Sequence, residues 1–169
     1  TRRNGTGDNK VYKPYGVGAD EPAILNPMFE GYRYHFTGLH HGPTGHPTED
    51  AELCDALMKR LFNKVDAHLD ELELNEEYML EDADIMIIAY GSVSLGVTEA
   101  INRMRKEGIK VGMFRPLTIW PSPAKRIKEL MTRFDKVLIT ELNMGQFADE
   151  VERVSGRSDF DTLFKVNGR

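Results

Sequence analysis

The sequence predicts an α/β fold: a three-layer sandwich in which a mostly parallel sheet of about four or five strands lies between flanking helices. Residues 84–141 carry the signal, because three short apolar runs alternate there with two segments of helical period. Glycine or proline separates these segments. The first run, 85–90, shows no alternation of apolar and polar residues, as expected of a strand that is covered on both faces.

The elements of this stretch are expected in a regular order. Strands are predicted at 85–90, 111–114, 136–140 and 159–166. Helices are predicted after Ser92, around 127–134 and around 147–154, where apolar residues recur at helical spacing. In the first helix, Glu99 and Arg103 stand four residues apart and should form an ion pair. Gly108 supplies its left-handed end.

The functional residues are expected at one edge of this sheet. Crossovers between parallel strands are right-handed almost without exception, so the strands point the same way and their carboxyl ends share an edge. Ligands and partners of open parallel sheets usually bind at that edge. The residues that could contact a partner or an anion there are Ser92, Ser94, Arg115, Glu141 and Asn143.

Two groups at this edge have alternative interpretations. Ser92 or Ser94 could cap the first helix with its hydroxyl, and the free amides of that helix could hold an anion. A tight turn between strand and helix explains the same residues and is favoured. Glu141 and Arg115 are placed at the ends of neighbouring strands and could form an acid/base site. A structural ion pair between them is favoured, since no nucleophile stands beside them in the sequence.

Composition narrows the functional classes. The chain has 169 residues, 40% of them hydrophobic and 29% charged, which is typical of one globular core. It shows no signal peptide and no apolar run long enough to span a membrane. Its basic residues are scattered without interleaved aromatic residues, which argues against nucleic-acid binding. Its single cysteine, Cys54, cannot form an internal disulfide or hold a metal cluster alone, so a cytoplasmic location is expected.

Three regions are predicted along the chain. Residues 1–47 form an extended segment that wraps over a surface, and residues 48–82 form a long amphipathic helix and an acidic connector. Residues 83–169 form the α/β domain. Charge differs between them, with 12 acids and 3 bases in 48–82 but 11 acids and 14 bases in 83–169. Because the chain begins without methionine and ends just past a strand, we expect an excerpt of a longer polypeptide whose last domain is cut short.

The long helix is predicted to begin after Thr48, which is the expected cap. Leucines spaced mostly by four give one apolar stripe of roughly 24 residues, or roughly 35 Å at a rise of 1.5 Å per residue. A helix of that length would project or pack on another chain, and association into an oligomer is expected. The alternative is two shorter helices with a break near 68–74.

A histidine-rich loop precedes this helix. His40, His41 and His46 lie within seven residues, and Glu49 or Asp50 could add a ligand for zinc or iron. The spacing fits no standard ligand pattern, however. A rigid loop with hydrogen-bonding imidazoles is therefore favoured, and no metal site is assigned.

Several stretches together resemble a known family, the 2-oxoacid:ferredoxin oxidoreductases, and within it the C-terminal part of the α subunit of the 2-oxoglutarate type. The resemblance covers nearly the whole chain. It rests on the order and spacing of three segments: TGLHHGPTGHPTEDAEL, GSVSLGVTEAINRMRKEGIKVGMFRPLTIWPSP and ITELNMGQ.

The resemblance implies a fold similar to the C-terminal domain of transketolase and a place in a multi-subunit enzyme. That enzyme would decarboxylate 2-oxoglutarate oxidatively to succinyl-coenzyme A and pass electrons to ferredoxin or flavodoxin. Thiamine diphosphate with magnesium would bind to the diphosphate-binding β subunit and to a domain outside this chain. An iron–sulfur cluster would lie in a δ subunit, and a γ subunit would complete the assembly.

For this segment the resemblance implies a structural and assembly role. No catalytic or cofactor-binding residue is carried over, and the segment alone is expected to be inactive. His40 and His41 would lie where two domains join, close enough to face the active site. Two competing functions are a module that binds coenzyme A phosphates or another acidic small molecule through Ser92, Ser94 and Arg115, and a metal-dependent hydrolase built on the histidine loop.

Overall fold

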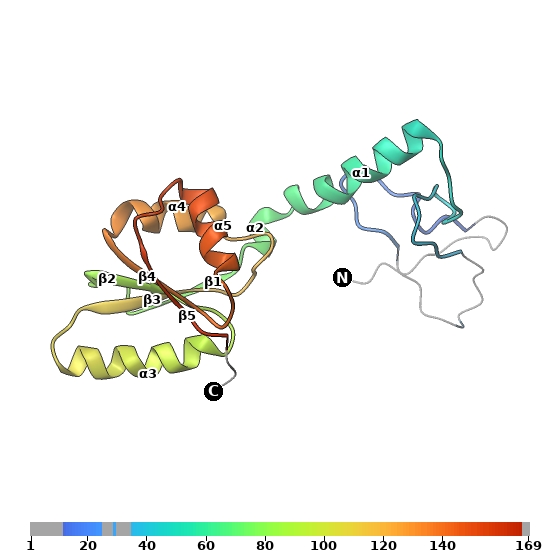
Figure 1. The fold of residues 1–169 in the computed structure, drawn as a ribbon. Helices are drawn as coiled ribbons and strands as arrows, with labels where there is room; N and C mark the ends of the chain where they lie inside the picture. The colour runs from blue at the N-terminus through green and yellow to red at the C-terminus, as the bar shows by residue number, and fades with distance from the viewer. Residues whose placement is uncertain (1–11, 25–28, 30–34, 167–169) are drawn as a thin grey trace. The chain divides into compact units, whose positions relative to one another are not determined.

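The computed structural model describes residues 12–24, 29 and 35–166 (Figure 1). It divides the chain into two compact units, Thr1–Leu69 and Asp70–Arg169. Each unit is described by itself. Within the described residues, no helix has the length and apolar content that crossing a membrane requires.

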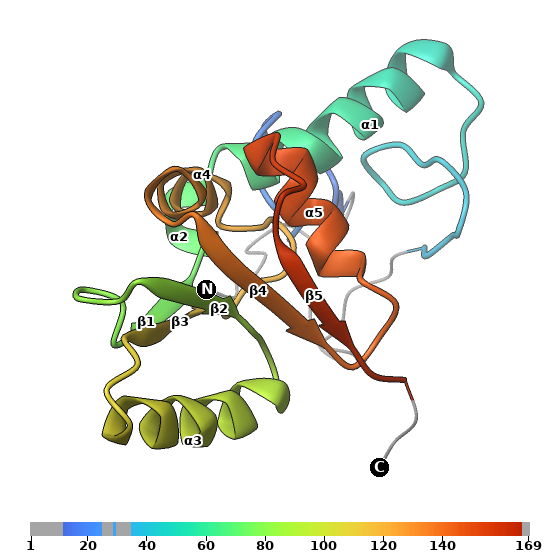
Figure 2. The same ribbon diagram turned by 60° about the vertical axis from the view of Figure 1, so that its left-hand side comes forward.

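The second unit contains a five-stranded sheet with the strand order β1-β3-β2-β4-β5 (Figure 2). The strands are β1 Asn75–Tyr78, β2 Ile85–Ile88, β3 Val111–Pro116, β4 Lys136–Glu141 and β5 Asp161–Phe164. The last four strands are mutually parallel, and β1 runs antiparallel to β3 at the edge of the sheet. The predicted α/β fold with a mostly parallel sheet is therefore confirmed.

Helices cover both faces of this sheet. They are α3 Val93–Lys106, α4 Ala124–Arg133 and α5 Gln146–Ser155. Figures 1 and 2 show α3 on one face and α4 with α5 on the other. Two expected features of α3 are confirmed: Arg103 Nε donates to Glu99 Oε1 at 2.9 Å, and Gly108, which follows the helix, has a φ of 84°.

Two apolar clusters fill the space between these layers. Ile87 belongs to the cluster beneath α3, and its neighbour Ile88 belongs to the cluster beneath α4 and α5. Successive side chains of a strand point to opposite faces, so a strand that is covered on both faces must be apolar at every position. This explains why the first apolar run shows no alternation.

The edge strand β1 was not expected from the sequence. Its residues, Asn-Glu-Glu-Tyr, lie within the acidic connector and carry no apolar signal. The strand is held at the sheet edge partly by two ion pairs with arginines from β3 and α4, Glu76–Arg115 at 3.0 Å and Glu77–Arg126 at 2.5 Å. After the strand, Asp82 pairs with Arg105 of α3 at 2.9 Å. The charge imbalance along the sequence is thus partly compensated within the unit.

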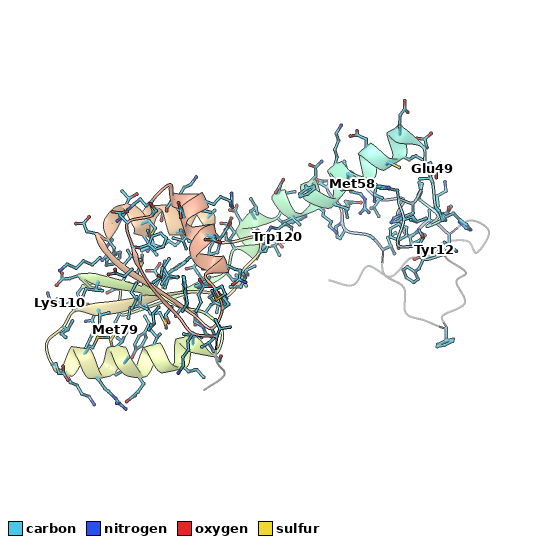
Figure 3. All side chains as sticks on the ribbon, viewed as in Figure 1. Tyr12, Glu49, Met58, Met79, Lys110 and Trp120 are labelled. Atoms are coloured by element: carbon cyan, nitrogen blue, oxygen red, sulfur yellow. The ribbon has the colours of Figure 1, made fainter. Side chains whose placement is uncertain are left out.

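A tight turn follows β1. Met79 has a φ of 51°, and the next residue, Leu80, is buried in the core. The turn passes directly over Gly112 of β3, where an added Cβ atom would lie 2.4 Å from the Met79 carbonyl oxygen. Only glycine leaves room for this backbone approach. Figure 3 shows Met79 and Lys110 at one end of the unit and Trp120 at the other.

The first unit contains the helix α1, Ala51–Asp66, and the short helix α2, Leu69–Leu72, begins at its last residue. The single helix of roughly 24 residues is therefore wrong, and the alternative of two shorter helices is correct. The break comes at Ala67 and His68, where the His68 amide donates to the Val65 carbonyl oxygen in a tightened last turn.

The cap of α1 also differs from the prediction. Asp50 is the N-cap residue, and its carboxylate accepts from the Leu53 amide at 2.9 Å. The Thr48 hydroxyl instead accepts from the Asp50 amide at 3.2 Å. Thr48 therefore lies two residues before the N-cap, and its hydroxyl holds the backbone of Asp50 in place.

Candidate functional site

The carboxyl edge of the sheet brings most of the predicted site residues together. Because β2 is parallel to both β3 and β4, the segments that follow these strands leave the same edge. Ser92 and Ser94 lie at the start of α3, and Arg115 lies near the end of β3. Glu141 ends β4, and Asn143 lies in the loop before α5.

Glu141 is the most constrained residue at this edge. Its side chain is buried, with 1% of its surface exposed. Its Oε2 atom accepts from the Tyr90 hydroxyl at 2.9 Å, from Asn143 Nδ2 at 2.9 Å and from the Phe147 amide at 3.0 Å. Its Oε1 atom accepts from the Ala148 amide at 2.9 Å. Four donors thus compensate the cost of burying this carboxylate.

The same network completes the start of α5. The first amides of a helix have no partner within the helix, and its positive end favours a carboxylate. Glu141 accepts from two of these amides, and Asn143 Oδ1 accepts from the Gly145 and Gln146 amides at 2.7 and 3.3 Å. Glu141 therefore fixes where α5 begins relative to β4.

The predicted ion pair between Arg115 and Glu141 is wrong. Their strands are not neighbours, because β2 lies between β3 and β4 in the sheet. Arg115 Nη1 instead donates to Glu76 Oε2 at 3.0 Å on the unexpected strand β1. The two residues therefore do not form the acid/base pair that was the other interpretation.

Tyr90 belongs to this network and was missed by sequence reasoning. Burial raises the pKa of its phenol above the usual value, and the hydrogen bond to Glu141 raises the pKa further. The phenol therefore remains a neutral donor to the carboxylate at neutral pH. Its signal in the sequence was its place at the end of the first apolar run, directly before Gly91.

The start of α3 offers less to an anion than the sequence suggested. The Ser94 hydroxyl is buried and donates to the Gly91 carbonyl oxygen at 2.7 Å. Ser92 is the N-cap residue, but its side chain makes no capping hydrogen bond, so the predicted hydroxyl cap is wrong. A shallow hollow of about 310 Å³ lies beside them and is mostly apolar, with Val93, Val97, Ala100 and Leu142 in its lining.

Exposed apolar side chains gather at this edge. Met144, Leu95 and Trp120 are 74%, 71% and 68% exposed. Leu74, which precedes β1, joins them because its carbonyl oxygen accepts from the Leu117 amide after β3. We call this set the apolar rim; it consists of Leu74, Leu95, Leu117, Ile119, Trp120, Leu142 and Met144. Several large apolar side chains exposed along one edge are a feature that protein–protein interfaces share.

The histidine loop lies in the first unit and is packed through its rings. The Tyr15 and His41 rings have centroids 3.9 Å apart, and the His35 and His46 rings stack at 5.0 Å. His40 is exposed. Among the described residues, no group of three or more His, Cys, Asp or Glu side chains could hold a metal ion. The placement of His40 and His41 near an active site stays a prediction.

The donor set of this chain does not fit an iron–sulfur cluster. Such a cluster needs at least two cysteine thiolates, even where histidines replace the other ligands, and the sequence contains one cysteine. That residue, Cys54, is partly buried in α1, and its thiol donates to the Thr48 carbonyl oxygen at 3.7 Å. Any cluster in the complete protein would need ligands from outside this chain.

Comparison with known proteins identifies relatives over most of the chain. The 2-oxoglutarate synthase subunit KorA of Methanocaldococcus jannaschii is 38% identical over 148 residues, which cover 87% of this chain and 39% of that protein. The ketoisovalerate oxidoreductase subunit VorB of Methanothermobacter thermautotrophicus is 35% identical over 166 residues, which cover 86% of this chain and 46% of that protein. The chain thus spans less than half the length of these relatives.

A solved structure and a family profile agree with these relatives. The 2-oxoglutarate:ferredoxin oxidoreductase from Magnetococcus marinus, solved with 2-oxoglutarate, coenzyme A and succinyl-CoA bound, has a TM-score of 0.79 and 27% identity. The similarity covers 98% of this chain and 29% of that one. Residues 83–169 match the family described as pyruvate:ferredoxin oxidoreductase core domain II. The chain therefore belongs to this family of oxidoreductase domains.

Proposed function

We propose that this chain is the C-terminal domain of the α subunit of a 2-oxoglutarate:ferredoxin or flavodoxin oxidoreductase. The complete enzyme would depend on thiamine diphosphate and would convert 2-oxoglutarate to succinyl-coenzyme A by oxidative decarboxylation. Within it, this chain would have a structural role in joining the subunits. It would contribute no catalytic residue and would be inactive alone.

The names of the relatives support 2-oxoglutarate as the substrate. The KorA relatives are named 2-oxoglutarate synthase subunits, and the solved relative carries 2-oxoglutarate, coenzyme A and succinyl-CoA. The VorB relatives act in a ketoisovalerate oxidoreductase. Two 2-oxoacids therefore occur among the relatives, and 2-oxoglutarate is favoured because the solved relative also uses it.

The apolar rim is the observation that carries the assembly role. Trp120, Leu95 and Met144 are more than two-thirds exposed, and aromatic side chains and methionine are enriched at protein interfaces. The carboxylate of Glu141 has four donors within the unit, so it is already occupied. The carboxyl edge therefore offers a contact surface and no free acid or base from Glu141.

The remaining parts of the enzyme would be provided from outside this chain. Thiamine diphosphate and magnesium would bind between other domains and the β subunit, and the iron–sulfur cluster would lie in a δ subunit, with γ as a further partner. Ferredoxin or flavodoxin would accept the electrons. We place this assembly in the cytoplasm, in agreement with the single unpaired cysteine.

The test replaces Trp120 by glutamate in the full-length α subunit, which is co-expressed with its partner subunits. We expect loss of co-purification and of 2-oxoglutarate-dependent, coenzyme A-dependent electron transfer, because a charge would be buried in the interface. Ile109→Glu is the matched control, since Ile109 is exposed at the opposite edge of the sheet. An intact, fully active complex with Trp120→Glu would contradict the assembly role. Preference for ketoisovalerate over 2-oxoglutarate would contradict the substrate.

A further inference from the structure

A cavity of about 530 Å³ lies within the first unit, between α1 and the loops that precede it. Its volume is in the range of small-molecule sites. The walls are largely apolar, and the residues that form them on the loop side are Tyr15, Val17 and Pro43. Leu53 and Leu57 of α1 form the opposite side. An apolar body of a few carbon atoms could be buried between these walls.

One buried cation lines this cavity. Arg60, in the middle of α1, is 8% exposed, and its Nη1 atom donates to the Glu21 carbonyl oxygen at 3.2 Å. Among the described residues, no carboxylate lies within ion-pair distance of Arg60. Asp55 also lines the cavity, but its carboxylate pairs with Lys59 at 2.7 Å. A buried guanidinium that no described carboxylate neutralises is costly, so the site favours an anion.

We propose that this cavity binds a small monocarboxylate with an apolar body. The planar guanidinium of Arg60 retains donors that match the two oxygens of a carboxylate. A single buried cation balances a single negative charge, which favours a carboxylate over a phosphate dianion. The tilted contact between the Tyr15 and His41 rings holds one wall in place. This proposal is independent of the oxidoreductase function, because no residue of the carboxyl edge takes part.

The test is a calorimetric titration of the purified chain with hexanoate, and 1-hexanol serves as the uncharged probe of the same length. We expect saturable binding of hexanoate and much weaker binding of hexanol. Arg60→Met should weaken hexanoate binding about tenfold to a hundredfold, as expected for loss of hydrogen bonds to a charged group. Lys64→Met is the matched control, because Lys64 is a cation of the same helix that does not line the cavity, and hexanoate binding should be unchanged.

A second variant separates loss of the site from loss of the fold. Ala56 lines the cavity and is exposed on α1, so Ala56→Phe should fill the space while leaving Arg60 in place. Binding of hexanoate should then fall while the circular dichroism spectrum and melting temperature stay close to wild type. The proposal is overturned if hexanoate shows no saturable binding at millimolar concentration, if hexanol binds equally well, or if Arg60→Met binds like wild type.

Discussion

The two edges of the sheet differ in the side chains that they expose. At the carboxyl edge the polar side chains of Glu141 and Ser94 are buried and hydrogen-bonded within the unit, while the apolar rim is exposed. At the amino edge a hollow is lined by charged residues, among them Asp135, Lys136 and Asp159, together with apolar residues of the strands. Large apolar side chains on a surface are stable when a partner covers them, whereas charged ones are stable in water. The difference between the edges therefore agrees with the proposed assembly role, in which a partner subunit would cover the apolar rim.

The largest loss of stability is expected for substitution of Glu141, the buried carboxylate at the carboxyl edge. Glu141→Gln replaces two acceptor oxygens by one oxygen and an amide donor, so at least one buried donor loses its acceptor. We expect the free energy of unfolding to fall by about 2 to 3 kcal/mol or more. Chemical denaturation measures this loss.

The control for that variant is Glu76→Gln. Its carboxylate pairs with Arg115 at the sheet edge and is more than half exposed. Loss of an exposed pair should cost less than about 1 kcal/mol. An equal loss of stability in the two variants would contradict the prediction that the buried Glu141 carboxylate contributes more than the exposed one of Glu76.

A smaller change in stability is expected when two glycines, one near each edge, are replaced by alanine. Gly112→Ala would place a Cβ atom against the Met79 backbone near the amino edge, and we expect a loss of about 1 to 3 kcal/mol. Gly96→Ala lies in α3 near the carboxyl edge, where nothing lies within 4 Å of an added Cβ atom. This second variant should gain about 0.5 to 1 kcal/mol through helix propensity. Thermal melting measures both, and equal signs would contradict the prediction.

The smallest effect concerns acid stability at the amino edge. The hydrogen bond from Arg105 lowers the pKa of Asp82 below its ordinary value of 3.8. A lowered pKa in the folded state gives stability that is present above pH 3.8 and is lost as the pH falls through the folded value. Arg105→Met should therefore show a shallower loss of stability on acidification below that pH. Denaturation at a series of pH values measures the slope, and an unchanged slope would mean that the pair contributes nothing.

Sequence reasoning succeeded where the signal was local. The parallel strands were predicted from continuous apolar runs. Ile87 and Ile88 show why such runs occur, because they pack into the clusters on opposite faces of the sheet and must both be apolar. The strand β1 was not predicted, because Asn75–Tyr78 carries charge and no apolar alternation. It is held by β3 and by arginines that are distant in the sequence, so no local pattern could identify it.

The candidate site shows the same division. Glu141 and Asn143 were correctly placed at the carboxyl edge, since both follow an apolar run directly. Their partners were not predicted, because strand order decides them: β2 separates Glu141 from Arg115 and brings Tyr90 to the carboxylate instead. A parallel sheet can be recognised from a sequence more easily than the order of its strands.

The sequence by itself determined the α/β class, the direction of the parallel strands, the exclusion of an internal disulfide and the resemblance to an oxidoreductase α subunit. These features depend on residue type and short-range periodicity. Only the tertiary structure decided which partner each charged side chain takes, which apolar side chains remain exposed at the carboxyl edge, and that Arg60 is buried beside a cavity. These depend on contacts between residues far apart in the chain, where packing outweighs local preference.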